Sequence, residues 1–219
     1  MSGNYKSVFD IIGPVMVGPS SSHTAGAVAI GRAAHKLFSQ EITQVTVDYY
    51  ESFARTHRGH GTDFAIIAGV LGMETDDLRV PDAVEIARSR GIGVRFVEHE
   101  GKSPVGHPNT AVVTLRNGGK EVRVAGCSIG GGTIEIRGIQ IDGHEFTPAG
   151  PLPIIVCWAR DGKQNSILES LADGEDFIVR KAERSDRAGK CLLEFDLDKK
   201  PDRRVLDRIA SMSRELVCL

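Results

Sequence analysis

The segment Ala111-Val112-Val113-Thr114-Leu115-Arg116-Asn117-Gly118-Gly119-Lys120-Glu121-Val122-Arg123-Val124-Ala125 contains two strand-forming runs separated by a turn. Residues 111–116 and 121–125 are rich in β-branched side chains, which favour extended backbone. The Asn-Gly-Gly sequence at 117–119 tolerates the positive φ angles that a tight hairpin turn requires. The segment therefore predicts an antiparallel β-hairpin.

Helices and strands are predicted on both sides of this hairpin. Apolar residues recur at helical spacing in 24–39, 62–71 and 81–90, and further strands are expected at 44–50, 93–98 and 133–136. A glycine triplet at 130–132 predicts either a β-bulge or the close approach of another backbone or a ligand. Helices mixed with antiparallel strands indicate the α+β class.

A break in composition at residues 146–153, with three prolines and one glycine, predicts a linker. We therefore divide the chain into domains 1–147 and 148–219. In the second domain the predicted order is strand 153–159, helix 164–172, strand 176–184, strand 190–197, helix 201–212 and strand 216–219. This βαββαβ order is typical of a ferredoxin-like domain.

The composition is that of a globular chain, since 41% of the 219 residues are hydrophobic and 26% are charged. Lys plus Arg (27) nearly balance Asp plus Glu (29), and no basic run supports nucleic-acid binding. The N-terminus lacks a signal-peptide pattern and no apolar run reaches the roughly 18 residues of a membrane helix, so a cytoplasmic location is predicted. The four cysteines are scattered, which gives no basis for a metal site built by this chain alone.

Gly18-Pro19-Ser20-Ser21-Ser22-His23-Thr24-Ala25-Gly26 places hydroxyls and an imidazole directly before a predicted helix. A helix start favours anions because its first backbone N–H groups are unpaired. The segment is therefore a candidate carboxylate or phosphate site, and a redundant helix cap is the alternative.

Three further loops carry polar residues or glycines. In Gly59-His60-Gly61-Thr62-Asp63, His60 is suited to bind a carboxylate or to act as a general acid or base, the alternative being a capping loop, while His57 and Arg58 are expected to be solvated. His107-Pro108-Asn109-Thr110 and Ser128-Ile129-Gly130-Gly131-Gly132 are weaker candidates, a turn and a bulge being their alternatives. Taken together, these loops predict a polar pocket that binds a small anion.

These segments, with Val8-Phe9-Asp10-Ile11-Ile12-Gly13-Pro14-Val15-Met16 before them, resemble the β chain of iron–sulfur L-serine dehydratases, in the same order. The resemblance covers most of residues 5–145, and Ser-Ser-Ser-His-Thr is its most specific motif. That family's β chain also ends in an ACT-type domain, a βαββαβ regulatory fold, in agreement with the order predicted above.

The resemblance implies a hetero-oligomeric enzyme that converts L-serine to pyruvate and ammonia. Its α chain holds a [4Fe-4S] cluster, which acts as a Lewis acid on the substrate hydroxyl while a base removes the α-proton. In this chain the resemblance assigns His23 and His60 to catalysis. It assigns substrate binding to hydroxyl, carboxyl, imidazole and amide side chains: Ser20, Ser21, Ser22, Thr24, Asp63, His107 and Asn109.

The C-terminal domain departs from the usual ACT pattern, because residues 160–165 lack the Asp-x-x-Gly-type ligand loop. A pairing surface is therefore expected there, with amino-acid binding as the alternative. Cys218 is expected to be a buried thiol in the last strand, and a ligand to the partner's cluster is its alternative.

Two other functions stay open. The first domain also resembles the allosteric substrate-binding domain of some phosphoglycerate dehydrogenases, which implies a non-catalytic module that senses a carboxylate or phosphate. The chain is alternatively a structural partner that stabilises an α chain.

Overall fold

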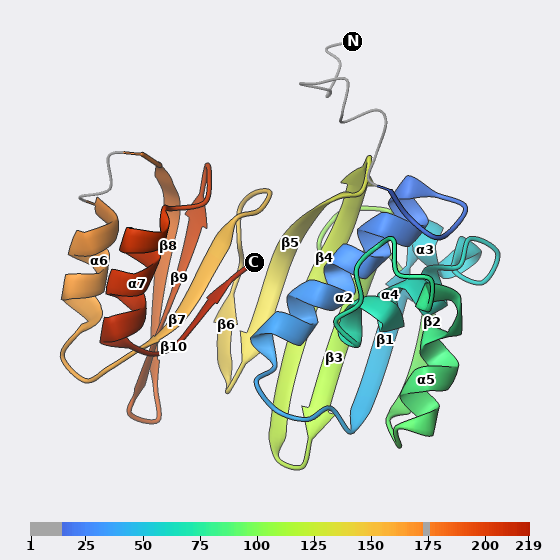
Figure 1. The fold of residues 1–219 in the computed structure, drawn as a ribbon, viewed down its shortest axis with the longest axis horizontal. Helices are drawn as coiled ribbons and strands as arrows, with labels where there is room; N and C mark the ends of the chain where they lie inside the picture. Colours follow the sequence, from blue (N-terminus) through green and yellow to red (C-terminus); the bar gives the residue numbers. More distant parts are fainter. Residues whose placement is uncertain (1–14, 173–175) are drawn as a thin grey trace, which may run out of the picture. The chain divides into compact units, whose positions relative to one another are not determined.

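The computed structural model describes residues 15–172 and 176–219 (Figure 1). The chain forms two compact units, residues 1–137 and 138–219. Of the motif at residues 8–16, residues 8–14 lie outside the described part of the chain. The division at 137/138 falls inside strand β5 (Thr133–Ile141), ten residues before the predicted boundary. Strand β5 neighbours β4 (Lys120–Gly130) on one side and pairs with β6 (His144–Phe146) on the other, so it belongs to both units.

The first unit confirms the predicted mixture of helices and strands. The six-stranded sheet has the order β2-β1-β3-β4-β5-β6, of which β6 and the end of β5 belong to the second unit. Strands β1 and β2 are parallel, and the pairs β1–β3, β3–β4 and β5–β6 are antiparallel. Its remaining strands and its helices, in chain order, are η1 (Ser21–Ala25), α2 (Gly26–Leu37), β1 (Gln44–Tyr50), α3 (Glu51–Thr56), α4 (Thr62–Val70), η2 (Val80–Asp82), α5 (Ala83–Ser89), β2 (Gly93–His99) and β3 (Asn109–Asn117).

The predicted hairpin is confirmed as β3 and β4. Asn117 pairs with Lys120 at its tip, and Gly118 has a φ of 55°, as the turn requires. Helix α2 lies across these strands and α4 packs beside α2 (Figure 1). Strand β1 alternates buried and more exposed residues, so one of its faces forms the core. The central strand β3 is buried at six consecutive positions, 110–115.

Helix α3 was not predicted from the sequence. It has only six residues, and Phe53 is the only one of them that is buried, so it carries no helical periodicity. A tertiary contact holds it in place, since the backbone N–H groups of Ser52 and Phe53 both donate to the Pro108 carbonyl. The helix predicted from residue 24 begins earlier, at Ser21, because the π-helical turn η1 precedes α2.

The second unit confirms the predicted βαββαβ order. After β6 it contains β7 (Ile154–Ala159), α6 (Gln164–Ala172), β8 (Val179–Arg187), β9 (Lys190–Leu197), α7 (Arg203–Met212) and β10 (Ser213–Cys218). The antiparallel sheet has the order β10-β7-β9-β8. Helices α6 and α7 lie side by side on one face (Figure 1) and bury a core that includes Ile155, Phe195 and Ile209.

Among the described residues, no helix is long and apolar enough to cross a lipid bilayer.

Candidate functional site

The start of the long helical element η1–α2 is organised by its own side chains. Ser20 has extended backbone, and its hydroxyl accepts a hydrogen bond from the His23 backbone N–H at 3.3 Å. The same hydroxyl lies 3.4 Å from Nδ1 of His23. Ser21 and Ser22 are half-buried in this turn, while Thr24 is buried. Ser20 therefore caps the element, as in the alternative that the sequence leaves open, and its hydroxyl also contacts the His23 ring.

His23 and His60 come together although 37 positions separate them. Their ring centroids are 4.6 Å apart with an edge-to-face geometry, and Phe53 lies 5.1 Å from His23. The Thr24 hydroxyl donates to the His60 carbonyl at 3.5 Å, which links the two loops. The fold thus brings together the two histidines that the resemblance assigns to catalysis.

The environment of His23 favours a neutral ring. Burial lowers its pKa from 6.5, and the nearby His60 lowers the pKa further. Its Nε2 atom is buried and has no hydrogen-bond partner in the described part of the chain. His60, in contrast, is exposed. A neutral imidazole with one uncommitted nitrogen is able to accept or donate a proton near neutral pH.

His57 corrects an expectation from the sequence, because it is buried rather than solvated. Its Nδ1 lies 2.6 Å from an Asp63 carboxylate oxygen, and its Nε2 lies 2.9 Å from a Glu98 oxygen. The hydrogen bond from His57 and the charge of Arg58 lower the pKa of Glu98. Arg58 itself is exposed, as expected. Asp63, a predicted substrate ligand, is therefore engaged by His57.

The loop with His107 and Asn109 is linked to the His23 region through helix α3. The His107 Nδ1 accepts a hydrogen bond from the Asn109 backbone N–H at 3.2 Å, and Pro108 binds the backbone of α3. Helix α3 in turn supplies Phe53 to the His23 ring. Burial, followed by the charge of Arg137, lowers the pKa of His107. The loop therefore borders the His23 region through α3.

The glycine triplet forms the β4–β5 turn. Gly130, Gly131 and Gly132 have φ values of 108°, 60° and 81°, which only glycine adopts without strain. Open space surrounds the position of a Cβ on Gly130. A hairpin turn rather than a bulge thus accounts for the triplet.

Within residues 15–172 and 176–219, no group of three His, Cys, Asp or Glu side chains is arranged to hold a metal ion. Cys127 and Cys157 are buried, and burial raises the pKa of Cys157 to about 12. Cys191 and Cys218 are half-buried.

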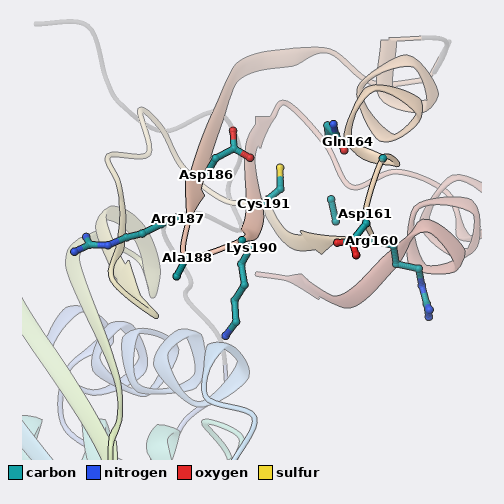
Figure 2. Close-up of a pocket in the computed structure, with 11 residues that line it drawn as sticks. Arg160, Asp161, Gln164, Asp186, Arg187, Ala188, Lys190 and Cys191 are labelled. Atoms are coloured by element: carbon teal, nitrogen blue, oxygen red, sulfur yellow. The ribbon is translucent and has the colours of Figure 1, made fainter.

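The second unit contains a cavity of about 370 Å³ between the turn after β7 and the β8–β9 hairpin (Figure 2). Arg160 and Lys190 line it together with Asp161 and Asp186. All four groups are already engaged. Arg160 donates to the Ser213 carbonyl and Asp161 binds Arg214. Asp186 pairs with Arg184, and Lys190 pairs with Asp142. The lining carries both signs of charge, so it selects no particular ion.

The first unit is thus an α+β fold with paired histidines at a helix start. Residues 7–138 match the model of the family "Serine dehydratase beta chain". The chain is 42% identical over 215 residues to a probable L-serine dehydratase, beta chain, of Bacillus subtilis, covering 95% of this chain and 94% of that protein. It is 42% identical over 141 residues to the L-serine dehydratase, beta chain, of Peptoniphilus asaccharolyticus (64% and 63%). It is 31% identical over 128 residues to L-serine dehydratase 1 of Escherichia coli (56% and 28%).

This chain belongs to the serine dehydratase beta chain family. The resemblance seen in the sequence motifs is thereby confirmed.

Proposed function

We propose that this chain is the β subunit of a cytoplasmic L-serine dehydratase that converts L-serine to pyruvate and ammonia. Its partner is an α chain that holds a [4Fe-4S] cluster, and the two chains share the active site. Relatives named as L-serine dehydratase beta chains support the reaction and the need for a partner. The pairing of His23 with His60 at a helix start is the observation that carries the proposal.

The helix start binds the substrate carboxylate. Ser20, Ser21, Ser22 and Thr24 surround the first turn of η1, where backbone N–H groups and the positive end of the helix dipole favour an anion. No acidic residue lies in this turn to compete with the ligand. Asn109 and His107, on the loop tied to α3, contribute polar groups at the border of the site.

His23 and His60 handle protons in this site. His23 has a lowered pKa and an unpartnered Nε2, so at neutral pH it accepts a proton or orients a polar group of the substrate. His60, with an exposed ring, acts on the substrate from the side opposite His23. Asp63 supports them indirectly, since its carboxylate holds His57 at the start of the loop that carries His60.

The second unit serves as an ACT-type pairing domain. Its βαββαβ order and the sheet order β10-β7-β9-β8 support this assignment. The charged side chains that line its cavity are already bound to other residues of the chain, which favours pairing over amino-acid binding.

Co-expression with a cluster-bearing α chain under anaerobic conditions tests the function. The purified complex should be brown and should release pyruvate from L-serine, whereas the β chain alone should be colourless. His23→Ala and His60→Ala should each lower turnover at least ~100-fold in an intact complex. His144→Ala is the control and should leave turnover unchanged, since His144 lies on β6 in the second unit and its ring bonds the Ser185 hydroxyl at 2.8 Å.

Each competing function has its own signature in the same experiment. Near-normal turnover in both site variants, with the complex intact, contradicts the catalytic assignment. Variants that change only affinity or cooperativity indicate an effector module. If every loop variant still restores activity to the α subunit, the chain is a structural partner.

A further inference from the structure

Ser128 is a polar residue that the fold does not account for. It lies near the end of β4, its side chain is 0% exposed, and its hydroxyl has no hydrogen-bond partner among the described residues. Burying an unpaired hydroxyl destabilises the folded chain, a cost that alanine at this position would avoid. Folding alone therefore gives no reason for a serine here.

The Ser128 hydroxyl lies against the beginning of α2. A Cβ added to Gly26 would stand 2.4 Å from this oxygen, so the absence of a side chain at Gly26 permits the approach. The Ser128 carbonyl accepts a hydrogen bond from the Asn109 amide at 3.5 Å. Ser128 thus lies between the helical element of the candidate site and the Asn109 loop.

Two other buried polar atoms without partners in the described residues belong to the same region. They are Nε2 of His23 in η1 and the hydroxyl of Thr62, the first residue of α4. Both α4 and β4 contact η1. Thus η1 and the two elements that contact it each carry one buried polar atom with no partner among the described residues. A polar ligand at this point would pair with them.

We propose that Ser128 is a further substrate-contacting residue, whose hydroxyl donates a hydrogen bond to the carboxylate of L-serine at the start of the helical element. This inference rests on the proposed function of the chain. A hydroxyl both donates and accepts, whereas the bound carboxylate only accepts, so Ser128 complements the backbone N–H groups of the helix start.

The test is Ser128→Ala in the α–β complex, with L-serine as substrate. Losing one hydrogen bond to a charged group should raise KM about tenfold or more and change kcat much less, because the bond is present before and during the reaction. The thermal midpoint should stay unchanged or rise, since the removed hydroxyl has no partner among residues 15–172 and 176–219. Ser128→Cys, with a weaker donor of similar size, should give an intermediate KM.

Ser213→Ala is the matched control. Ser213 is 2% exposed, but its hydroxyl donates to the Ile209 carbonyl at 2.8 Å in the second unit. This variant should lower the thermal midpoint and leave KM unchanged.

Two outcomes overturn the inference: a KM in Ser128→Ala equal to that of the wild type, or a loss of activity accompanied by the same thermal destabilisation as in Ser213→Ala. If the wild-type complex does not turn over L-serine, the proposed function fails instead. An active wild type with an unaffected Ser128→Ala variant removes only the role of Ser128.

Discussion

Glu51 occupies the left-handed region of backbone conformation, with a φ of 46°, at the first position of α3. A residue with a Cβ is strained there by about 1–2 kcal/mol. The position cannot relax independently, because Tyr50 before it belongs to β1 and pairs with Thr110, while Ser52 after it binds the Pro108 carbonyl. The strand and the loop thus impose the conformation on Glu51.

Glu51→Gly should therefore stabilise the chain by roughly 0.5–1 kcal/mol, because glycine adopts this conformation without strain, although it also makes the unfolded chain more flexible. Urea denaturation of the purified chain measures the change. Ser52→Gly, one residue further into the same helix, should destabilise instead. Equal destabilisation by both substitutions would contradict the assignment of strain to Glu51.

At the scale of elements, helices α2 and α4 approach each other through glycines. A Cβ on Gly31 would lie 2.1 Å from the Ile66 carbonyl oxygen, and one on Gly69 would lie 2.1 Å from the Val28 carbonyl oxygen. Each glycine thus faces the backbone of the other helix. Because α2 begins with η1 and α4 begins beside His60, this close packing sets the separation of the two histidines.

Gly31→Ala and Gly69→Ala should each destabilise the chain by about 1–3 kcal/mol or more, since the methyl group meets backbone rather than a movable side chain. Chemical denaturation checks the loss, and weaker turnover in the complex should accompany it. Gly119→Ala is the control, as nothing lies within 4 Å of its added Cβ. If Gly31→Ala unfolds no more easily than Gly119→Ala, the helices are not held at this distance.

At the scale of the whole molecule, the second unit carries buried carboxyl groups on the sheet face opposite its helices. Glu194 is completely buried on β9, and burial, with the nearby Asp196 and Glu183, raises its pKa to about 8. Lys181 of β8 is the nearby cation and pairs with Glu183 at 2.7 Å. Asp196 accepts a hydrogen bond from the Ala149 N–H, so this face also anchors the segment before β7.

The free energy of unfolding should therefore fall as the pH rises through the window from about 4.5 to 8. Over this range folded Glu194 retains a proton that the unfolded chain has lost, so a higher pH favours unfolding. Urea denaturation at pH 6 and pH 8.5 measures the slope, which should be smaller in Glu194→Gln. The exposed Glu169 supplies the control, Glu169→Gln, whose slope should match the wild type. Identical slopes in all three proteins would rule out Glu194 as the source.

The sequence by itself determined the elements with strong local signals. Alternation and the Asn-Gly-Gly turn predicted β3 and β4, and apolar periodicity predicted α2 and α4. The order of elements predicted βαββαβ in the second unit, and the ordered motifs indicated the family. These features depend on neighbours within a few residues, which is the range over which patterns carry information.

Only the tertiary structure decided the environments of individual side chains. His57 and His60 are three positions apart, yet one is buried between Asp63 and Glu98 and the other is exposed. Helix α3 forms because the Pro108 carbonyl, more than fifty residues away, accepts its first N–H groups. Likewise, the unpaired hydroxyl of Ser128 is recognisable only from its surroundings. Burial and hydrogen bonding between distant segments are properties of the packed chain, so local patterns do not encode them.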